Sequence, residues 1–331
     1  MAAARRQTGK LARLSRACRA RAASVARFMH ARVAAPRTTR GCATVLGAAV
    51  FVAAAWSPAA CAGNFIGFSQ PGIPGTFGVL LFPSYSHSAP NINTGKMFTE
   101  LAYFSKTGVT GTTRDQFETW LGFYSGVQTT PKGSDDSAFG ISTPELGLEY
   151  YYHVVESADN TFGTDDFRSW WISPMLIFNA PNGSSKTGGF GAGANQWSIS
   201  ASVNNYFGYG RWHATVAPIA GAYLFHNYNL TELPSGSGVR MRGGLSLSLF
   251  DIAAGYQFIP NLLAGIHHVY NIYNIGGSDF QRATEGMIGP TFTYLGFAAQ
   301  NCFISGTLDV DYHHQGVPRS VSVNFSLVKN F

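Results

Sequence analysis

Charge is scarce in this sequence of 331 residues, because Asp, Glu, Lys and Arg together make up only 12% of it, about half of the usual share. Hydrophobic residues reach 45%, yet no internal run of about eighteen apolar residues occurs, which excludes an ordinary transmembrane helix. Aromatic residues are abundant at 14%, and glycine occurs 38 times. Few charges, many aromatic residues and no apolar helix together favour a β-barrel that crosses a membrane.

Motifs of common enzyme sites are also missing. The sequence contains no G-x-S-x-G elbow, no H-E-x-x-H motif and no P-loop. Cysteine adds little, because Cys18, Cys42 and Cys61 fall in an expected leader and only Cys302 follows it. An intrachain disulfide framework is thereby excluded from the mature chain. We expect no enzyme, no cofactor and no metal site.

Residues 1–62 have the composition of a secretory signal peptide. They contain eleven basic residues and no acidic one, and they end with the apolar run 42–56 and the small residues Ala60-Cys61-Ala62. This order predicts cleavage after Ala62, and a start at Met29 would give a leader of ordinary length. Removal of the leader leaves 12 basic and 17 acidic residues, a formal net charge of −5. The excess of positive charge in the full sequence therefore does not indicate nucleic-acid binding.

The last thirteen residues, Arg319–Phe331, alternate in polarity. Apolar and small polar residues follow one another in the order Ser320, Val321, Ser322, Val323, Asn324, Phe325, Ser326, Leu327. A period of two predicts a strand with one apolar and one polar face. The strand resembles the C-terminal signal strand of bacterial outer-membrane barrels, which ends in an aromatic residue, here Phe331. The resemblance implies recognition by the barrel-insertion machinery; the plainer alternative is an edge strand of a soluble protein.

Similar patterns predict twelve strands, an even number as in single-chain bacterial barrels. Their ranges are 78–87, 98–106, 117–127, 140–154, 167–179, 195–206, 211–225, 239–258, 261–273, 286–297, 302–313 and 319–331. In the strand 239–258 the alternation changes phase near Phe250 and Asp251, which predicts a β-bulge there. We therefore expect an all-β fold, a transmembrane antiparallel up-and-down β-barrel of about 12 strands over residues 78–331.

The segments around these strands suggest an orientation. Short and long connections alternate through the second half, as periplasmic turns and outer loops do in such barrels. The segment 155–166 is an exception, because it should be periplasmic but is long. Residues 63–77 contain two prolines and four glycines, and we expect an irregular segment that either hangs in the periplasm or plugs the lumen.

Several short motifs occur in one order along the chain. They are PGIPGTFGVLLFPSYS (71–86), WISPMLIFNAPNG (171–183), GANQWSISASVNNYFGYGRW (193–212), AAGYQFIPNLLAGIHHVY (253–270) and EGMIGPTFTY (285–294). Together they resemble the bacterial outer-membrane transporter family known as putative meta-pathway phenol-degradation proteins. The resemblance implies an outer-membrane barrel that passes small aromatic or hydrophobic compounds, and it implies no catalytic residue.

Charged residues within the strands are expected to line the lumen, because a charge facing lipid near the midplane costs about 2–4 kcal/mol. The candidates are Glu145, Glu149, Arg240, Arg242, Asp309 and Asp311. Since both signs occur, internal ion pairs that narrow the pore are predicted. Trp120, Tyr124, Trp171 and Phe104 are expected to form an aromatic inner wall, suited to flat hydrophobic solutes or to packing against residues 63–77.

Two chemical alternatives are weak. His213 together with Asp309 or Asp311 and a lumen serine suggests a barrel hydrolase, but serines are common on lumen faces anyway. The pairs His267-His268 and His313-His314 suggest a metal, but adjacent strand residues point to opposite faces and cannot chelate as neighbours. A cross-strand site with Asp309 or Asp311 would be needed.

The sequence therefore predicts an outer-membrane channel for passive uptake of small hydrophobic or aromatic solutes. Its partners would be outer-membrane lipids, the insertion machinery and the solute, and its place the bacterial outer membrane. The alternative is a non-conducting structural or surface-interaction barrel, and the third hypothesis is the barrel hydrolase.

Overall fold

The structure is a computed structural model, and it describes residues 65, 71–89, 92–112, 114–129, 138–141, 144–156, 162–180, 197–225, 244–275 and 282–331. These residues form thirteen β-strands and a single turn of 3-10 helix, Ala298–Gln300. The strands are β1 (Phe77–Ser88), β2 (Ile92–Phe104), β3 (Asp115–Thr129), β4 (Ala138–Ile141), β5 (Glu145–Val155), β6 (Arg168–Asn179), β7 (Ser198–Tyr209), β8 (Trp212–Leu224), β9 (Leu245–Ile259), β10 (Leu262–Ile275), β11 (Ala283–Tyr294), β12 (Cys302–Gln315) and β13 (Ser320–Asn330). Among the described residues, no helix is long and apolar enough to cross a membrane.

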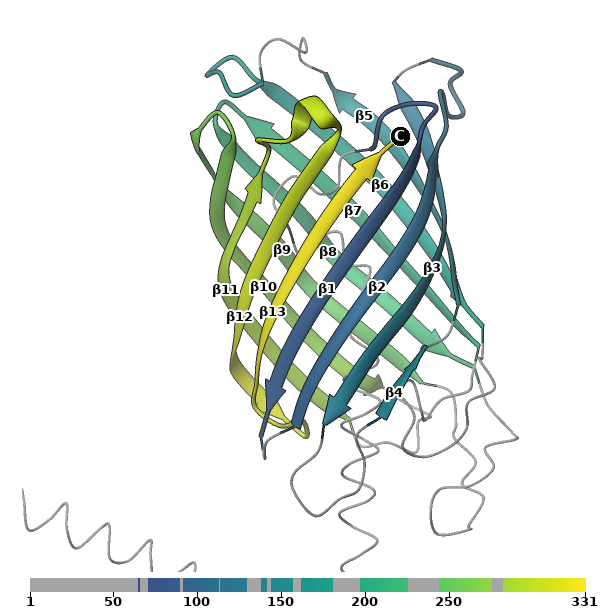
Figure 1. The fold of residues 1–331 in the computed structure, drawn as a ribbon, viewed down its shortest axis with the longest axis vertical. Helices are drawn as coiled ribbons and strands as arrows, with labels where there is room; N and C mark the ends of the chain where they lie inside the picture. The colour runs from purple at the N-terminus through teal and green to yellow at the C-terminus, as the bar shows by residue number, and fades with distance from the viewer. Residues whose placement is uncertain are drawn as a thin grey trace, which may run out of the picture. The chain divides into compact units, whose positions relative to one another are not determined.

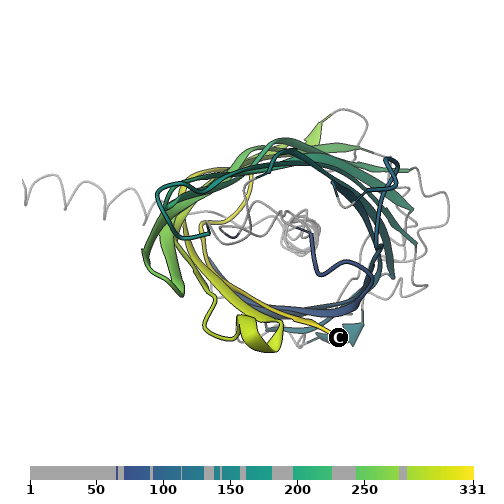
Figure 2. The ribbon, with the colours of Figure 1, turned by 90° about the horizontal axis from the view of Figure 1, so that it is seen from above.

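Twelve of the strands close into one antiparallel barrel (Figures 1 and 2). Each strand pairs with the next, and β1 pairs with both β2 and β13, which closes the ring. The short β4 lies outside this ring and pairs only with the end of β3. The prediction of an antiparallel barrel of twelve strands is confirmed. A closed ring leaves no edge whose backbone groups would face lipid without hydrogen bonds.

The polarity of the barrel is the reverse of that of a soluble protein, as β7 illustrates. Ser202 and Asn204 are 8% and 0% exposed, whereas Val203 and Phe207 are 41% and 40% exposed. Because successive side chains of a strand point to opposite faces, the polar residues turn inward and the apolar ones turn outward. Such a barrel fits a lipid surrounding, since a lipid-facing wall must be apolar.

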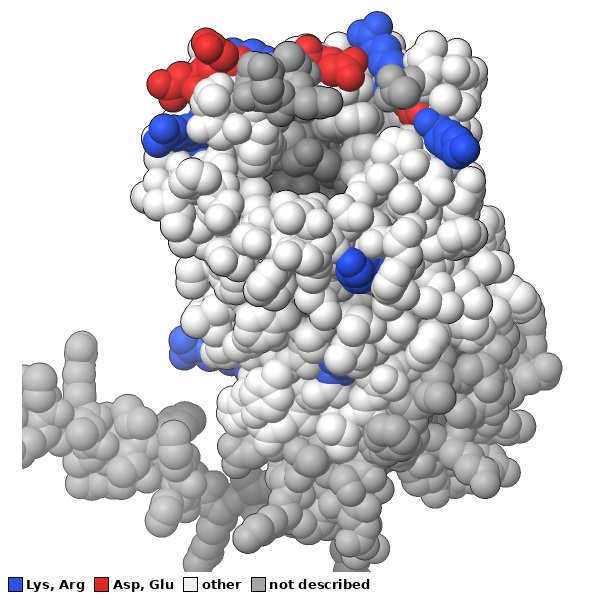
Figure 3. All heavy atoms as spheres, turned by 45° about the horizontal axis from the view of Figure 1, so that its top comes forward, with Lys and Arg blue, Asp and Glu red and all other residues white. Residues whose placement is uncertain are grey.

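The connections define the two ends of the barrel. Two of the shortest turns, 210–211 and 260–261, lie at the same end as the segment before β1 and the end of β13 (Figure 1). We call this the turn end, and the opposite end the loop end. In the view of Figure 3, the acidic side chains that the structure describes gather at the rim of the turn end, and the outer wall below shows none.

The bulge predicted near Phe250 and Asp251 is present. On β10, His268 pairs with Ile252 while Tyr270 pairs with Leu249, so β9 contains one residue more than its neighbour. Phe250 has a φ of 51° and lies outward, whereas Asp251 is buried. The extra residue therefore moves the acidic side chain from the lipid face to the interior of the barrel.

At the bulge, the Phe250 carbonyl accepts a hydrogen bond from a side chain. His268 Nδ1 donates a hydrogen bond to the Phe250 oxygen over 3.0 Å, and the Tyr312 hydroxyl lies 2.8 Å from His268 Nε2. An unpaired carbonyl facing lipid costs several kcal/mol, so the outward histidine stabilises the bulge. This accounts for one polar side chain on a mostly apolar wall.

Two strand predictions need correction. The predicted strand 140–154 is divided, because β4 ends at Ile141 and β5 begins at Glu145, just after Pro144. Proline has no N–H to give to a ladder, so it stands at the boundary. The predicted strand 98–106 begins too late, because β2 already starts at Ile92. Its first half contains asparagine, threonine, glycine and lysine and lacks the apolar residues that mark a strand.

Candidate functional site

Four glutamate side chains gather on the inner wall of β2, β3 and β5. Glu100, Glu118, Glu145 and Glu149 are each between 4% and 6% exposed. Glu118 and Glu149 are direct partners in the β3–β5 ladder, so their side chains lie next to each other on one face. We call these residues the four-glutamate cluster.

Few hydrogen-bond donors reach this cluster. Trp120 Nε1 donates to Glu145 Oε1 over 3.1 Å, and Asn204 Nδ2 donates to Glu149 Oε1 over 3.0 Å. The Tyr151 hydroxyl lies 2.7 Å from Glu118 Oε2 and 2.9 Å from Glu149 Oε2, and it has one proton to give. Because Glu118 and Glu149 share the single proton of Tyr151, their two charges repel each other unless one carboxyl group is protonated.

Trp120 lies over Gly147, its partner on β5. A Cβ atom added to Gly147 would overlap the indole ring. The missing side chain is therefore what allows the ring to lie flat against the wall and to point Nε1 at Glu145. Glycine in a strand often marks such a close approach.

Replacing Gly147 with valine is expected to displace Trp120 and to destabilise the barrel by about 1–3 kcal/mol, as overpacking does elsewhere. Urea-dependent refolding into lipid vesicles measures the loss, and the Trp120 emission should shift because its hydrogen bond to Glu145 is broken. Gly95 is the matched control, since an added Cβ meets only the Val127 side chain at 3.7 Å. Equal stability and emission of the Gly147→Val variant would refute this account.

Next to the cluster, inward residues of β1, β2 and β3 form an aromatic wall. Its members are Phe82, Phe98, Phe104, Trp120 and Tyr124. The ring centroids of Phe98 and Tyr124 are 4.5 Å apart, and those of Phe82 and Phe98 are 5.8 Å apart. These are ordinary distances for packed aromatic pairs. The polar inner face of the barrel thus has one apolar side.

Trp171 lies beyond the four-glutamate cluster. Its ring stacks on His153 with centroids 3.9 Å apart, and it meets Tyr151 edge-on at 6.5 Å. Trp120 and Trp171 are therefore not neighbours in one patch. They stand on either side of Tyr151, which contacts two of the glutamates.

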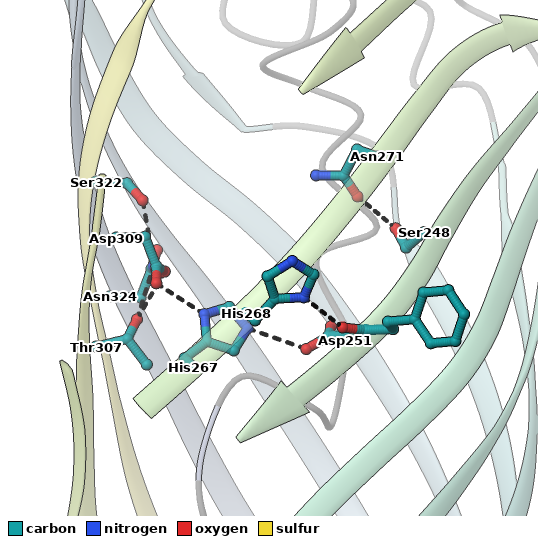
Figure 4. Close-up of polar contacts among 10 residues, drawn as sticks. Ser248, Asp251, His267, His268, Asn271, Thr307, Asp309, Ser322 and Asn324 are labelled. Atoms are coloured by element: carbon teal, nitrogen blue, oxygen red, sulfur yellow. Dashed lines mark hydrogen bonds and ion pairs between the residues drawn. The ribbon is translucent and has the colours of Figure 1, made fainter. Parts of the chain in front are cut away.

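A second polar network lies on β9, β10 and β12 (Figure 4). His267 Nε2 is 3.0 Å from Asp251 Oδ1, and His267 Nδ1 is 2.7 Å from Asp309 Oδ1. All three residues are at most 2% exposed. A doubly protonated imidazole can donate to both carboxylates.

A glycine makes this network possible. His267 pairs with Gly289 on β11, and β11 separates β10 from β12. A Cβ atom added to Gly289 would overlap the Leu308 carbonyl of β12, so this glycine allows β11 and β12 to approach closely beside Asp309. Thr307 and Asn324 then donate to the other oxygen of Asp309, over 3.1 Å and 3.4 Å. The three side chains of Asp251, His267 and Asp309 thus link β9, β10 and β12 across the intervening β11 on the inside of the barrel.

The remaining lumen candidates are placed differently. Asp311 is buried on β12, and its Oδ2 lies 3.1 Å from His314 Nδ1. Arg240 and Arg242 lie outside the described residues. Among the described residues, the buried aspartates Asp251, Asp309 and Asp311 pair with histidines, and the buried His153 lies 3.9 Å from the exposed Glu156. Whether these residues line a conducting lumen stays a prediction.

The turn end is narrowed from two sides. Gly72 packs against the inward Phe104 ring, and the Gly75 N–H donates to the Phe104 carbonyl over 2.9 Å. On the other side, Phe162 and Phe167 pack on the buried His213, with centroids 5.4 Å and 5.7 Å away. Residues 162–167, the described part of the long connection before β6, therefore fold back against the inner wall.

The chemical alternatives lack the necessary geometry. His213 is 2.6 Å from the Tyr206 hydroxyl, whereas Asp309 contacts His267, so each has another partner. His267 lies inward and His268 outward, as the strand period requires. Across the described strands and connections, no group of three or more His, Cys, Asp or Glu residues is arranged to hold a metal ion.

Sequence reasoning missed Glu100, Glu118 and Asp251 as members of these networks, and it considered His267 with Asp309 only as a metal site. Each lies within a predicted strand, and the cost of a charge facing lipid could have assigned each of them to the inside. The phase change at Phe250 was the specific signal for Asp251. The contact between His267 and Asp309 had no local signal, because it depends on the register of three strands.

No family model and no curated protein matches this chain. Among solved structures, it is similar to the crystal structure of the COG4313 outer membrane channel from Pseudomonas putida F1. The likeness covers 80% of this chain and 98% of that chain, with a TM-score of 0.62 and 13% identity. The transport unit of the autotransporter AIDA-I from Escherichia coli gives a TM-score of 0.44 at 10% identity, over 77% of this chain and 90% of that one. The NanC porin gives 0.39 at 11% identity, over 76% of this chain and all of that one.

The similarity to the COG4313 channel shows the fold alone, because the identity is 13%. The TM-scores of the other two structures lie below 0.5, which is too low to show a shared fold. The fold is that of a bacterial outer-membrane β-barrel. A closed barrel with an apolar outer wall and a polar inner wall belongs in that membrane.

Proposed function

We propose that this protein is an outer-membrane channel for the passive uptake of small hydrophobic or aromatic compounds, and that it catalyses no reaction. The observation that carries the proposal is the aromatic wall inside an otherwise polar barrel. Sites for small apolar molecules are lined mainly by aromatic and apolar side chains, with a few polar groups beside them. A barrel of twelve strands is wider than filled barrels of eight strands and narrower than porins of 16–18 strands.

Other parts of the chain are assigned with this proposal. Residues 1–62 are its signal peptide, with Met29 as an alternative start, residues 63–77 plug the turn end, and residues 78–331 form the barrel. The turn end then faces the periplasm, as short turns do in such barrels. The strand ending in Phe331 addresses the barrel to the insertion machinery. The resemblance to the phenol-degradation transporters supports an aromatic solute.

The proposal predicts that proteoliposomes containing the mature protein take up labelled phenol or toluene severalfold faster than empty vesicles. Replacing Phe98 and Tyr124 with serine should reduce this excess by about tenfold, because the wall loses the apolar surface of two rings. The matched control is Phe207→Ser, which removes an aromatic ring that lies outward on β7. Uptake equal to that of empty vesicles, from protein shown to be folded, would favour the non-conducting structural barrel.

A further inference from the structure

A lysine lies on the inner face of β2, close to the aromatic wall. Lys96 stands between Thr94 and Phe98 on one face of the strand, and these two neighbours are 3% and 2% exposed. Because every second side chain of a strand points to the same face, Lys96 points inward with them. By the same alternation, Arg168 and Lys329 lie on the outward face. Among the described strand residues, Lys96 is therefore the one Lys or Arg on the inner face.

The register places this lysine one row away from the aromatic rings. Residues that pair across β1, β2 and β3 form rows on the inner face of the barrel. One row consists of Ser84, Lys96 and Gly126, and the next row toward the turn end consists of Phe82, Phe98 and Tyr124. Adjacent rows on one face are about 6–7 Å apart along the strands. An ammonium group, a hydroxyl and three rings thus lie within reach of one small aromatic molecule.

Two glycines of β3 shape the wall at these rows. Gly126 has no side chain, so on this strand the wall beside Lys96 consists of backbone. A Cβ atom added to Gly122 would overlap the Phe98 ring, which shows that this ring lies over Gly122, on the side away from Lys96. The Tyr124 ring remains between the two glycines. The two glycines therefore leave Lys96 and Tyr124 without a further β3 side chain between them.

The charges along β2 have a fixed order. From the loop end to the turn end, the inward side chains are Lys96, Phe98 and then Glu100 of the four-glutamate cluster. Lys96 and Glu100 are about 13 Å apart along the strand, which exceeds the screening length of about 8 Å at physiological ionic strength. An anionic group at Lys96 would therefore be separated from the carboxyl group of Glu100 by the aromatic row.

We infer that Lys96, together with Ser84, binds the carboxylate of an aromatic acid whose ring lies against Phe98 and Tyr124. This inference rests on the proposed function and narrows its solute class to aromatic compounds that have an acidic group. An ammonium group donates three hydrogen bonds in rotatable directions, so Lys96 can bind a carboxylate in addition to any other acceptor that it contacts. Hydrogen bonds between charged groups are about twice as strong as those between neutral groups.

The test compares three probes with the same ring, benzoate, benzyl alcohol and benzylamine, at pH 7 with the purified mature protein in a neutral detergent. Titrations followed by the NMR signals of each probe give its Kd after correction for binding to protein-free micelles. We expect benzoate to bind at least about tenfold more tightly than either of the other two probes. In the Lys96→Met variant, which removes the charge and keeps a long side chain, the preference over benzyl alcohol should fall below about threefold.

Three further variants separate charge from packing. Lys96→Arg should keep most of the benzoate preference, because it keeps the charge. Phe98→Leu should weaken benzoate and benzyl alcohol by a similar factor and leave their ratio unchanged, because both probes have the same ring. Lys329→Met is the matched control. Lys329 lies outward at the turn end, with Nζ 5.4 Å from the centroid of the Phe331 ring, so its loss should not change the preference.

Equal binding of benzoate and benzyl alcohol to the unmodified protein would overturn the inference, and so would tighter binding of benzylamine or no binding of any probe. These results do not depend on any variant being folded. The proposed function is tested separately by the uptake of neutral phenol or toluene. Normal phenol uptake without a benzoate preference would leave the channel and remove only its acidic solute. A benzoate preference in a folded protein that takes up neither phenol nor toluene would keep the binding site and remove the neutral solutes.

Discussion

The His267→Ala variant is expected to unfold from vesicles with a free energy of unfolding about 3–5 kcal/mol lower than that of the unmodified protein. The reason is that both ring nitrogens contact carboxylates, Asp251 at 3.0 Å and Asp309 at 2.7 Å. Removal of the imidazole leaves two acidic groups buried in the wall without their cation. The measurement is urea-dependent refolding into vesicles, followed by the shift in gel mobility that folded barrels show.

Two controls separate charge from packing. The triple variant His267→Ala, Asp251→Asn, Asp309→Asn removes all three charges, and it should recover more than half of the lost stability. His268→Ala removes the outward neighbour, which supports one carbonyl, and it should cost only about 1–3 kcal/mol. If His267→Ala is as stable as His268→Ala, the network does not stabilise the barrel.

Deletion of residues 63–76 is expected to raise the single-channel conductance of the mature protein severalfold in a planar bilayer. Within this segment, Gly72 packs on the inward ring of Phe104 at the turn end. Phe65, further upstream, is only 3% exposed. Chain that occupies the mouth of a twelve-stranded barrel leaves little room for ions, so its removal should open the path.

A glycine-serine segment of the same length is the control for this deletion. If packing on Phe104 closes the pore, this replacement should conduct nearly as well as the deletion, because it has no side chains that fit the wall. A steady conductance that is the same in all three proteins would mean that the pore is open and that the segment is no plug. No conductance in any folded variant would leave only non-ionic passage or a structural role.

The fold could be predicted from the sequence because outward residues of a lipid-facing barrel are apolar and inward residues are polar, which gives each strand a period of two. β13 alternates from Ser320 to Leu327 and β7 from Ser198 to Asn204, and the bulge at Phe250 follows from a single change of phase. Strand boundaries were harder to predict where the alternation of polar and apolar residues is interrupted. Pro144 divides one predicted strand, and the polar first half of β2 hides another.

The candidate site was less predictable from the sequence than the fold. Glu145 and Glu149 were identified by parity, but the contacts of Glu149 with Asn204 and of Glu145 with Trp120 depend on which strands are adjacent and in what register. The same holds for His267, whose partners lie 16 and 42 residues away. Periodicity predicts the face of a strand on which a residue lies. Its hydrogen-bond partners can be identified only when the pairing and register of the strands are known.

The closure of the ring has a consequence for assembly. Hydrogen-bond partners in the polar networks are at most 55 positions apart in the chain, as Glu149 and Asn204 are, so each contact can form within a few consecutive hairpins. The seam between β1 and β13 pairs Gly78 with Asn330, almost the whole length of the barrel chain. Closing so long a loop costs more entropy than closing a hairpin. Slow folding through such distant contacts makes the seam the last ladder to form, and a chain held open there would already contain both polar networks.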